Sequence, residues 1–146
     1  MTSSRALARA GLVVSAAFLV SRILGWVRYV FIVDQFDSSG TLIKRLITGG
    51  PLNAPWGMAM APATFGKFAG ALLVGNFGDG TINAFDPTSG AMLGTLSAAD
   101  GTPIVVDGLW GIAFGNDLNS QPSNTLFFAA GPSQEQHGVY GRIDVQ

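Results

Sequence analysis

Four polar side chains at predicted turns have the chemistry to hold a divalent cation. Carboxylate and amide oxygens are hard ligands that suit Ca²⁺. The candidates for this weak ligand-binding site are Asn76, Asp79, Asn83 and Asn116. Their spacing is not that of an EF-hand loop, and Asp79-Gly80 is also a strong hairpin-turn signal. We therefore expect these residues to serve mainly as turn formers, with calcium as the alternative and no other cofactor.

The other residues with chemical potential do not form a catalytic group. His137 is the single histidine, and Glu135 lies two residues before it, whereas a metal site or an acid–base pair needs further partners. The segment GNFGDGT, residues 75–81, lacks the lysine and the following helix of a phosphate-binding loop. The absence of cysteine excludes disulfides and thiolate metal sites. We expect no catalytic residue and no metal site of this kind.

Composition and charge divide the chain into two parts. Hydrophobic residues make up 48% of the 146 residues and charged residues 12%, where about 25% charged is usual; this argues against a nucleic-acid-binding or disordered protein. Residues 1–30 carry four arginines and no acid, whereas residues 31–146 carry four basic and nine acidic side chains. A basic, apolar start before an acidic body is typical of a targeting or membrane segment. We predict an N-terminal membrane or signal helix over 1–30 and a β domain over 31–146.

The N-terminal segment does not distinguish a signal from an anchor. The uncharged span between Arg9 and Arg22 has 12 residues, too short for a bilayer, which needs about 20. A longer span, Ala10 to Val33, carries Arg22 and Arg28, so its free energy of insertion is near zero. No small-x-small cleavage pattern follows. We expect an extracytoplasmic protein that is membrane-anchored or secreted, with the membrane as a partner of this helix.

The segment FLVSRILGWVRYVFIV resembles the first transmembrane helix of the lipid II flippase family. Ser21, Arg22, Leu24, Gly25 and Arg28 match its Ser-Arg-x-Leu-Gly-x-x-Arg pattern. The resemblance implies that Arg22 and Arg28 face an anionic lipid headgroup. The family needs a dozen or more further helices, and no stretch after Val33 predicts one. A membrane protein related to the flippases is therefore an alternative function, not the leading one.

Internal repeats are the most informative feature of the rest of the chain. PWGMAMAP at 55–62 returns as LWGIAFGN at 109–116, and GALLVGNF at 70–77 returns as NTLFFAAG at 124–131, both after 54 residues. GTINAFD at 80–86 has counterparts in GVYGRID at 138–144 and FIVDQFD at 31–37. Labelling the strands A to D, we predict C and D within 31–47, A to D within 56–97, and A to C within 109–145.

A four-stranded unit repeated at about 40–55 residues is typical of a β-propeller. We predict a mostly β fold, a partial NHL-like propeller of about two blades and nine antiparallel strands, preceded by the N-terminal helix. The motifs LNAPWGMAMAP, GALLVGNFGDGTINAFDP, DGLWGIAFGN and NTLFFAAGP also resemble an uncharacterised family of secreted bacterial NHL-like propeller proteins. That resemblance implies export and supplies no activity.

Too few strands are present to close a propeller, which has four to eight blades. An open stack exposes strand edges and apolar sheet faces. A ring of copies, a fragment of a longer protein, a compact two-sheet β fold and a join of two sequences are the alternatives; we favour a fragment or a join, and we expect the isolated body to self-associate. Trp56 and Trp110 hold equivalent positions, and we expect both to fill the space between sheets. The leading function is a non-enzymatic binding or structural module, and the alternative enzyme is a metal-dependent, lactonase-like propeller hydrolase.

Overall fold

The structure, a computed structural model, describes residues 32–144. They lie in the second of two units, residues 1–30 and 31–146, and this second unit is described by itself. The predicted N-terminal helix, with Arg22 and Arg28, lies outside the described residues. Within residues 32–144, no helix has the length and apolar character needed to cross a bilayer.

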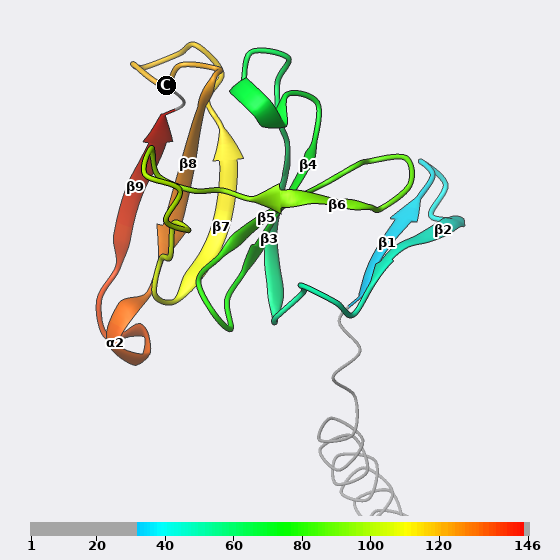
Figure 1. The fold of residues 1–146 in the computed structure, drawn as a ribbon, viewed down its shortest axis with the longest axis horizontal. Coiled ribbons are helices and arrows are strands. Elements are labelled where there is room, and N and C mark those ends of the chain that lie inside the picture. The colour runs from blue at the N-terminus through cyan, green and yellow to red at the C-terminus, as the bar shows by residue number, and fades with distance from the viewer. Residues whose placement is uncertain (1–31, 145–146) are drawn as a thin grey trace, which may run out of the picture. The chain divides into compact units, whose positions relative to one another are not determined.

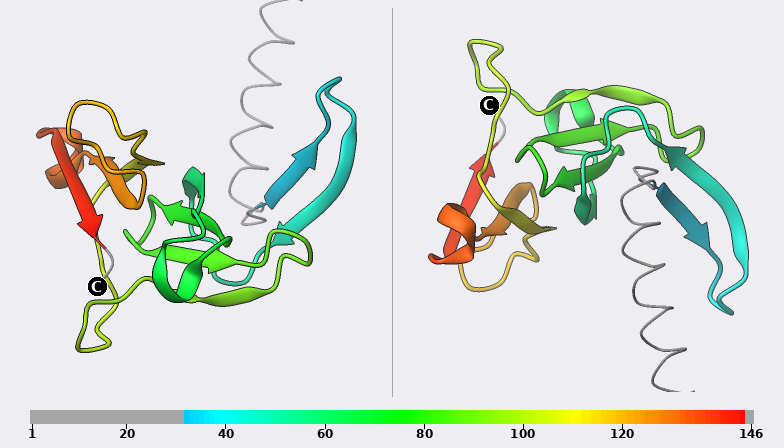
Figure 2. Two further views of the ribbon diagram at one scale, coloured as in Figure 1. Left: turned by 90° about the horizontal axis from the view of Figure 1, so that it is seen from above. Right: turned by 90° about the horizontal axis from the view of Figure 1, so that it is seen from below.

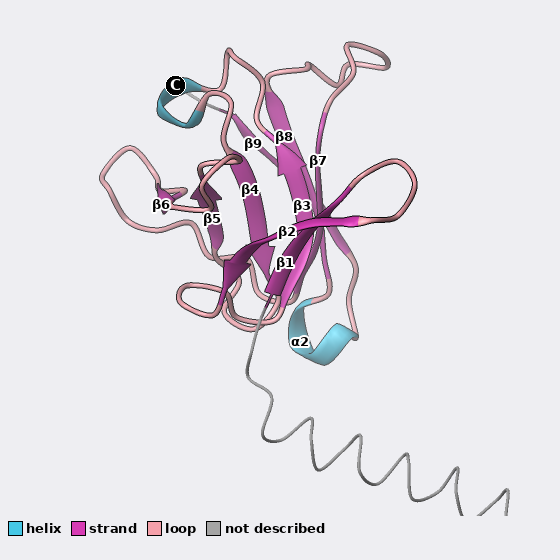
Figure 3. Ribbon diagram, turned by 90° about the vertical axis from the view of Figure 1, so that its right-hand side faces the viewer, coloured by secondary structure: helices cyan, strands magenta, loops and turns pink. Residues whose placement is uncertain are grey.

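Nine strands make up three antiparallel sheets in residues 32–144 (Figures 1 and 3). The strands are β1 (Ile32–Phe36), β2 (Leu42–Thr48), β3 (Pro55–Met60), β4 (Leu72–Asn76), β5 (Ile82–Phe85), β6 (Met92–Thr95), β7 (Leu109–Phe114), β8 (Thr125–Ala130) and β9 (Val139–Asp144). Two short helical turns, η1 (Gly66–Phe68) and α2 (Pro132–Glu135), interrupt the loops. Sheet orders β1-β2, β3-β4-β5-β6 and β7-β8-β9 each follow the chain.

This architecture confirms the predicted fold class. Each sheet is an up-and-down meander, and the nine described strands fall where positions C-D, A-B-C-D and A-B-C were predicted. The β3–β6 sheet stands between the β1–β2 hairpin and the β7–β9 sheet, as the two views of Figure 2 show. Sheets that follow one another in this way form a partial β-propeller.

The repeat extends to strand register. Met58, Ala59 and Met60 of β3 pair with Val74, Leu73 and Leu72 of β4. Their counterparts 54 residues later, Ile112, Ala113 and Phe114, pair with Phe128, Phe127 and Leu126. Both pairs of strands have a register shift at the same place, between Pro55 and Met58 and between Leu109 and Ile112. The Trp-Gly dipeptide of each repeat therefore lies at an equivalent β-bulge.

The turns after the predicted C strands are also repeated. The main-chain carbonyls of Asp37 and Asp86 each accept a hydrogen bond from the amide of the glycine three or four residues on, Gly40 or Gly90. The Asp86 carboxylate also accepts from the amides of Thr88 and Ser89, at 3.0 and 2.6 Å. An aspartate that caps its own turn is the standard way in which this residue stabilises a reversal.

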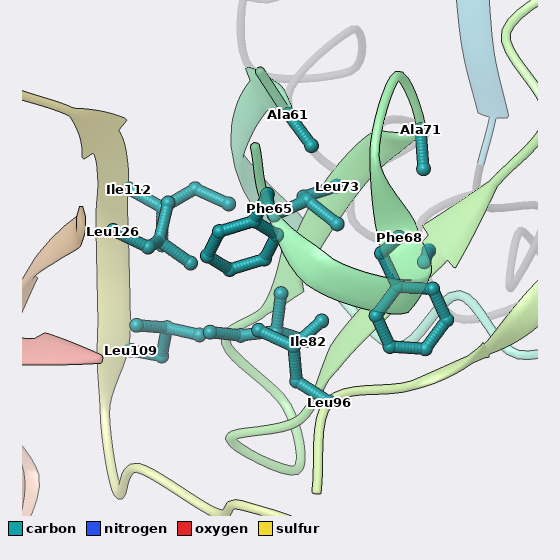
Figure 4. Packing of buried hydrophobic residues seen from close by; sticks show 11 residues of the cluster. Ala61, Phe65, Phe68, Ala71, Leu73, Ile82, Leu96, Leu109, Ile112 and Leu126 are labelled. Carbon is teal, nitrogen blue, oxygen red and sulfur yellow. The ribbon is translucent and has the colours of Figure 1, made fainter. Parts of the chain in front are cut away.

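The main core lies between the β3–β6 sheet and the β7–β9 sheet (Figure 4). Leu73 and Ile82 face β7 from one side, and Leu109 and Leu126 face them from the other; all four side chains are fully buried. Phe65 packs edge-on against Phe114, with ring centroids 4.8 Å apart. A smaller cluster, which contains Val33, Ile47, Leu52, Val74 and Phe85, joins the β1–β2 hairpin to the other face of the β3–β6 sheet.

The tryptophans occupy equivalent places, but the prediction that both fill the space between sheets is wrong. Trp56 is 64% exposed, and its ring centroid lies 5.8 Å from that of Phe77. Trp110 is half-buried against Gly131, which stands 54 residues after Phe77. Side-chain alternation places Trp56 on the face of β3 turned away from β7. That face stays open because the β1–β2 hairpin supplies only strands C and D to cover it.

Candidate functional site

The structure brings three of the four predicted ligand-binding residues together at the end of β4 and β5. Asn76 is fully buried, and its Nδ2 donates to the Pro51 carbonyl at 2.9 Å and to Thr81 Oγ1 at 3.1 Å. Asn83 Nδ2 donates to the same Pro51 carbonyl at 2.9 Å. The side-chain oxygens are also engaged: Asn76 Oδ1 accepts from the Asn53 amide at 3.0 Å, and Asn83 Oδ1 accepts from Thr95 Oγ1 at 2.7 Å.

Asp79 completes this polar cluster from the β4–β5 turn. Its Oδ1 accepts from the Thr81 amide and hydroxyl at 3.0 and 2.7 Å, and its Oδ2 accepts from Asn53 Nδ2 at 3.1 Å. Partial burial raises the pKa of Asp79, but the hydrogen bonds from Thr81 and Asn53 together lower it by more than burial raises it. The net pKa therefore lies below its usual value. Each of these oxygens is used to hold the turn and the loop 51–54 against it.

The remaining candidates lie elsewhere. Asn116 is exposed in the β7–β8 loop, where its Oδ1 accepts from the Leu118 amide at 3.1 Å. His137 is exposed near α2, and Glu135 accepts from Trp110 Nε1 at 3.3 Å. Among residues 32–144, no three histidine, aspartate or glutamate side chains gather closely enough to share a metal ion.

The sequence predicted exposed sheet faces but not which residues form them; the structure places one such face on the β7–β9 sheet, where it is built like the covered face of the β3–β6 sheet. Within the chain, the front face of the β3–β6 sheet, meaning the face toward β7, receives the backbone of β7 at Gly57. A Cβ added to Gly57 would come within 2.7 Å of the Ile112 nitrogen and 2.8 Å of the Trp110 oxygen. The equivalent glycine of the next sheet, Gly111, meets no atom within 4 Å. The same site of close approach is therefore occupied by β7 at Gly57 and is open at Gly111.

The equivalent face of the β7–β9 sheet, which carries Gly111 and is turned away from the β3–β6 sheet, is its front face, and it extends over the side chains around Gly111. Ala113 and Phe127 stand in the places that Ala59 and Leu73 hold in the covered sheet, because both pairs are opposite one another in register. Tyr140 takes the place of Ile82; Ile82 is fully buried, whereas Tyr140 is 66% exposed. The Tyr140 ring stacks on Phe127, with centroids 5.8 Å apart and planes 14° apart.

Three hollows mark uncovered parts of the stack. One of about 240 Å³ lies on the open front face and is lined by Gly111, Ala113, Phe127 and Tyr140 among others. A second, of about 280 Å³, separates β1 from β3 and is lined by Val33, Met58, Met60 and Leu72 among others. The third, of about 470 Å³, lies between η1, the segment 96–99 and the end of β9 at Ile143 and Asp144. Each adjoins a sheet face or edge where the repeat would place a further strand.

A repeat-period signal could have found the open face. The 54-residue shift equates Gly57 with Gly111 and Ala59 with Ala113, so a small residue that a neighbouring strand covers in the first unit identifies one that is open in the next; Ala113 is exposed, whereas Phe127 is already buried under the Tyr140 ring. In each Trp-Gly dipeptide the large side chain belongs to the tryptophan, but the glycine is the residue that marks where the backbones approach.

No family model matches this chain. Three proteins of Acanthamoeba polyphaga mimivirus, each described only as an uncharacterized protein, are similar to it. Two are 36% and 38% identical over 111 residues, which is 76% of this chain. The third is 36% identical over 80 residues, 55% of this chain. The chain spans 28% and 26% of the length of the first two relatives and 15% of the third.

One solved structure is also similar, the PQQ-bound aldose sugar dehydrogenase from Streptomyces coelicolor. The two chains are 23% identical, and the match covers 80% of this chain and 29% of the dehydrogenase, with a TM-score of 0.49. A likeness at this level carries no argument about the activity of this chain.

Proposed function

We propose that this protein is a non-enzymatic binding module of the extracytoplasmic space, exported or tethered by residues 1–30, which binds proteins through the open front face of its β7–β9 sheet. The partner is a protein that presents an apolar β-sheet face. In this proposal the chain acts by presenting sheet surface, not by positioning catalytic groups.

The pair Gly57 and Gly111 carries this proposal. A glycine is needed at residue 57 because β7 passes within van der Waals contact of it. Gly111 has the same place in register and no such neighbour. Around it, the exposed side chains of Ala113 and Tyr140, with Phe127 buried beneath the Tyr140 ring, form an apolar surface that matches, position by position, one that already accepts a strand. Exposed apolar surface that retains interior-like packing chemistry is typical of interaction sites.

A second copy of the chain offers a suitable partner surface for a test. Met58 and Met60 lie on the face of β3 opposite to the front face and are 54% and 55% exposed. Their counterparts Ile112 and Phe114 are the residues of β7 that face the β3–β6 sheet. Because the β1–β2 hairpin already packs against the rest of that face, contact between copies is restricted to the strands β7 and β8 of one copy and β3 and β4 of the other.

The proposal is tested by Gly111→Val in the full chain, with self-association followed by sedimentation in a mild detergent over a concentration series. A valine at this strand position has free space in the monomer and blocks the approach of a partner strand, so association weakens while the melting temperature stays unchanged. Gly138→Val is the matched control, since Gly138 also meets no atom within 4 Å but lies outside the front face. If Gly111→Val associates as well as the unaltered chain does, the front face is not the binding surface.

A further inference from the structure

Among residues 32–144, one edge of strand β9 has no strand partner, whereas the equivalent edge in the complete four-stranded sheet is covered by β6. In the β3–β6 sheet, β5 pairs with β4 on one side and with β6 on the other. β9 holds the place of β5, and among the described residues it pairs with β8 alone. Within the described part of the chain, its Val139–Asp144 backbone therefore presents a row of N–H and C=O groups without strand partners, which is a template for another strand.

The direction of these backbone groups follows from the repeat. The Ile82 carbonyl accepts from the Leu96 amide at 2.9 Å, so it points toward the outer strand. Tyr140 is the counterpart of Ile82, and alternate residues of a strand point their backbone groups to the same side. The N–H and C=O groups of Tyr140 and Arg142 accordingly point to the open edge.

Two copies of β9 have complementary side chains when they are paired antiparallel. In an antiparallel pair of two β9 strands centred on Gly141, Val139 lies opposite Ile143 and Tyr140 lies opposite Arg142. Both pairs occur twice, because the arrangement has two-fold symmetry. Apolar pairs and aromatic–cation pairs directly opposite one another stabilise a sheet. Centring the pair on Arg142 instead would place two arginines opposite each other, which disfavours that register.

The side chains that would pair are already held in place. Stacking on Phe127 fixes the Tyr140 ring on the front face of the sheet. Arg142 Nε lies 3.0 Å from Asp144 Oδ2, which extends the guanidinium along the same face. The Tyr140 ring is exposed, the Arg142 side chain is 57% exposed, and Val139 is 43% exposed. Ordered, exposed side chains lose less conformational entropy on association than free ones do.

We propose that two copies of this chain pair through β9, edge to edge and antiparallel about Gly141, into one six-stranded sheet β7-β8-β9-β9-β8-β7. This interface shares Tyr140 with the front face of the proposed function but does not involve Gly111, and Arg142→Glu alters it without changing an apolar residue of that face. It makes a closed dimer, because each copy uses its own β9 edge.

Charge exchange at the paired positions tests the register. Arg142→Glu removes the attraction to Tyr140 of the partner copy, and Tyr140→Lys sets a lysine against Arg142; each weakens dimerisation of the full chain by roughly tenfold or more. The double variant Tyr140→Lys/Arg142→Glu sets the introduced lysine against the introduced glutamate in both pairs and restores the dimer. Arg45→Glu is the matched control, since Arg45 is also an exposed strand arginine paired with an aspartate, Asp34.

Cross-linking gives a second measurement that does not depend on charge. The chain has no cysteine, so Val139→Cys and Ile143→Cys chains can be mixed. These positions form a pair without backbone hydrogen bonds, for which Cα atoms lie about 4.5 Å apart, within the range of a disulfide. The mixture forms a disulfide-linked dimer, whereas each variant alone does not, because like positions lie four residues apart along the strand. Melting curves verify that both variants fold.

The outcomes separate this interface from the front face. If Arg142→Glu and Tyr140→Lys dimerise as the unaltered chain does, or if the double variant is not rescued, edge pairing at β9 is wrong, and the effect of Gly111→Val still decides the proposed function. If the charge variants lose the dimer and Gly111→Val has no effect, β9 pairing stands and the front-face proposal fails. An unaltered chain that stays monomeric over the whole concentration series overturns β9 pairing and excludes a second copy as the partner of the front face.

Discussion

Asn76 shows how a side chain with ligand-like chemistry is used inside this fold. It is fully buried, and its amide makes hydrogen bonds to Pro51, Asn53 and Thr81. Buried polar groups are costly unless they are paired, and a fully satisfied network stabilises a unique arrangement. At this position the network fastens the loop between the first two sheets to the end of β4.

Asn76→Ala should therefore lower the free energy of unfolding by about 2–4 kcal/mol, because it removes a fully buried side chain and leaves the half-buried Asn53 amide without its acceptor. Asn116→Ala is the matched control: its hydrogen bond to the Leu118 amide caps an exposed turn, so the cost should stay below about 1 kcal/mol. Urea unfolding of both variants checks this. Equal losses would show that the buried network is not what the loop depends on.

Acid should destabilise the chain through its turn aspartates. Hydrogen bonds from the backbone and hydroxyl of Ser89 and from the Thr88 backbone, together with Lys44, hold the pKa of Asp86 below its usual value of 3.8. Hydrogen bonds from Ser39 and Thr41 act in the same way on the pKa of Asp37. A lowered folded-state pKa contributes stability that is present above 3.8 and is lost as the pH falls toward the folded pKa.

Asp86→Asn should thus make the pH dependence of the melting temperature below about pH 4 less steep than in the unaltered chain, since one of the lowered carboxyl groups is removed. Thermal melts between about pH 2 and pH 5 measure this. A steep acid transition that persists in Asp86→Asn would place the acid-sensitive groups elsewhere.

At the residue scale, the sequence predicted turn chemistry better than packing. The patterns Asp-x-x-Gly, Asp-Gly and Asp-x-x-x-Gly act locally, so the turns after β1, β4 and β5 could be predicted. The burial of Trp56 could not, because it depends on whether another sheet covers its face of β3. The bonds from Asn76 and Asn83 to Pro51 join residues more than twenty positions apart, and no local pattern indicates them.

At the scale of elements, the internal repeat of the sequence predicted all nine of the strands that the structure describes. Alternating apolar residues between turn signals, combined with the 54-residue shift, established their order. The register shift at each Trp-Gly dipeptide could not be predicted, since a bulge leaves the apolar pattern of a short strand almost unchanged. The short turn α2, with left-handed backbone at Ser133 and Gln134, explains why the last strand is shifted by 58 residues instead of 54.

The two equivalent glycines should respond differently to the same change. Gly57→Ala forces the β7 backbone outward, because the added Cβ would lie 2.7 Å from a main-chain nitrogen; we expect a loss of about 3 kcal/mol. Gly111→Ala enters open space and should change stability by no more than about 0.5 kcal/mol. Chemical denaturation of the pair is the measurement, and similar losses would contradict the close approach of β7 to β3.

At the scale of the whole molecule, the described strands make a stack that does not close on itself. The predicted alternative, a metal-dependent propeller hydrolase, would be stabilised by its ion, because a ligand that binds only the folded state raises the melting temperature. Since the oxygens of Asn76, Asp79 and Asn83 already hold protein partners, we expect the melting temperature to be the same in calcium and in EDTA. A melting temperature that rises when calcium is added and falls again when EDTA removes it would favour the hydrolase.

The middle sheet depends on both of its neighbours. All four residues of β5, Ile82 to Phe85, are buried, and the side chains that cover them come from β7 on one face and from the β1–β2 hairpin on the other. The amide hydrogens of β5 should therefore be the last to exchange with deuterated water, and they should do so only when the flanking sheets detach. Unfolding should thus begin with the flanking sheets and reach β5, the most buried strand, last.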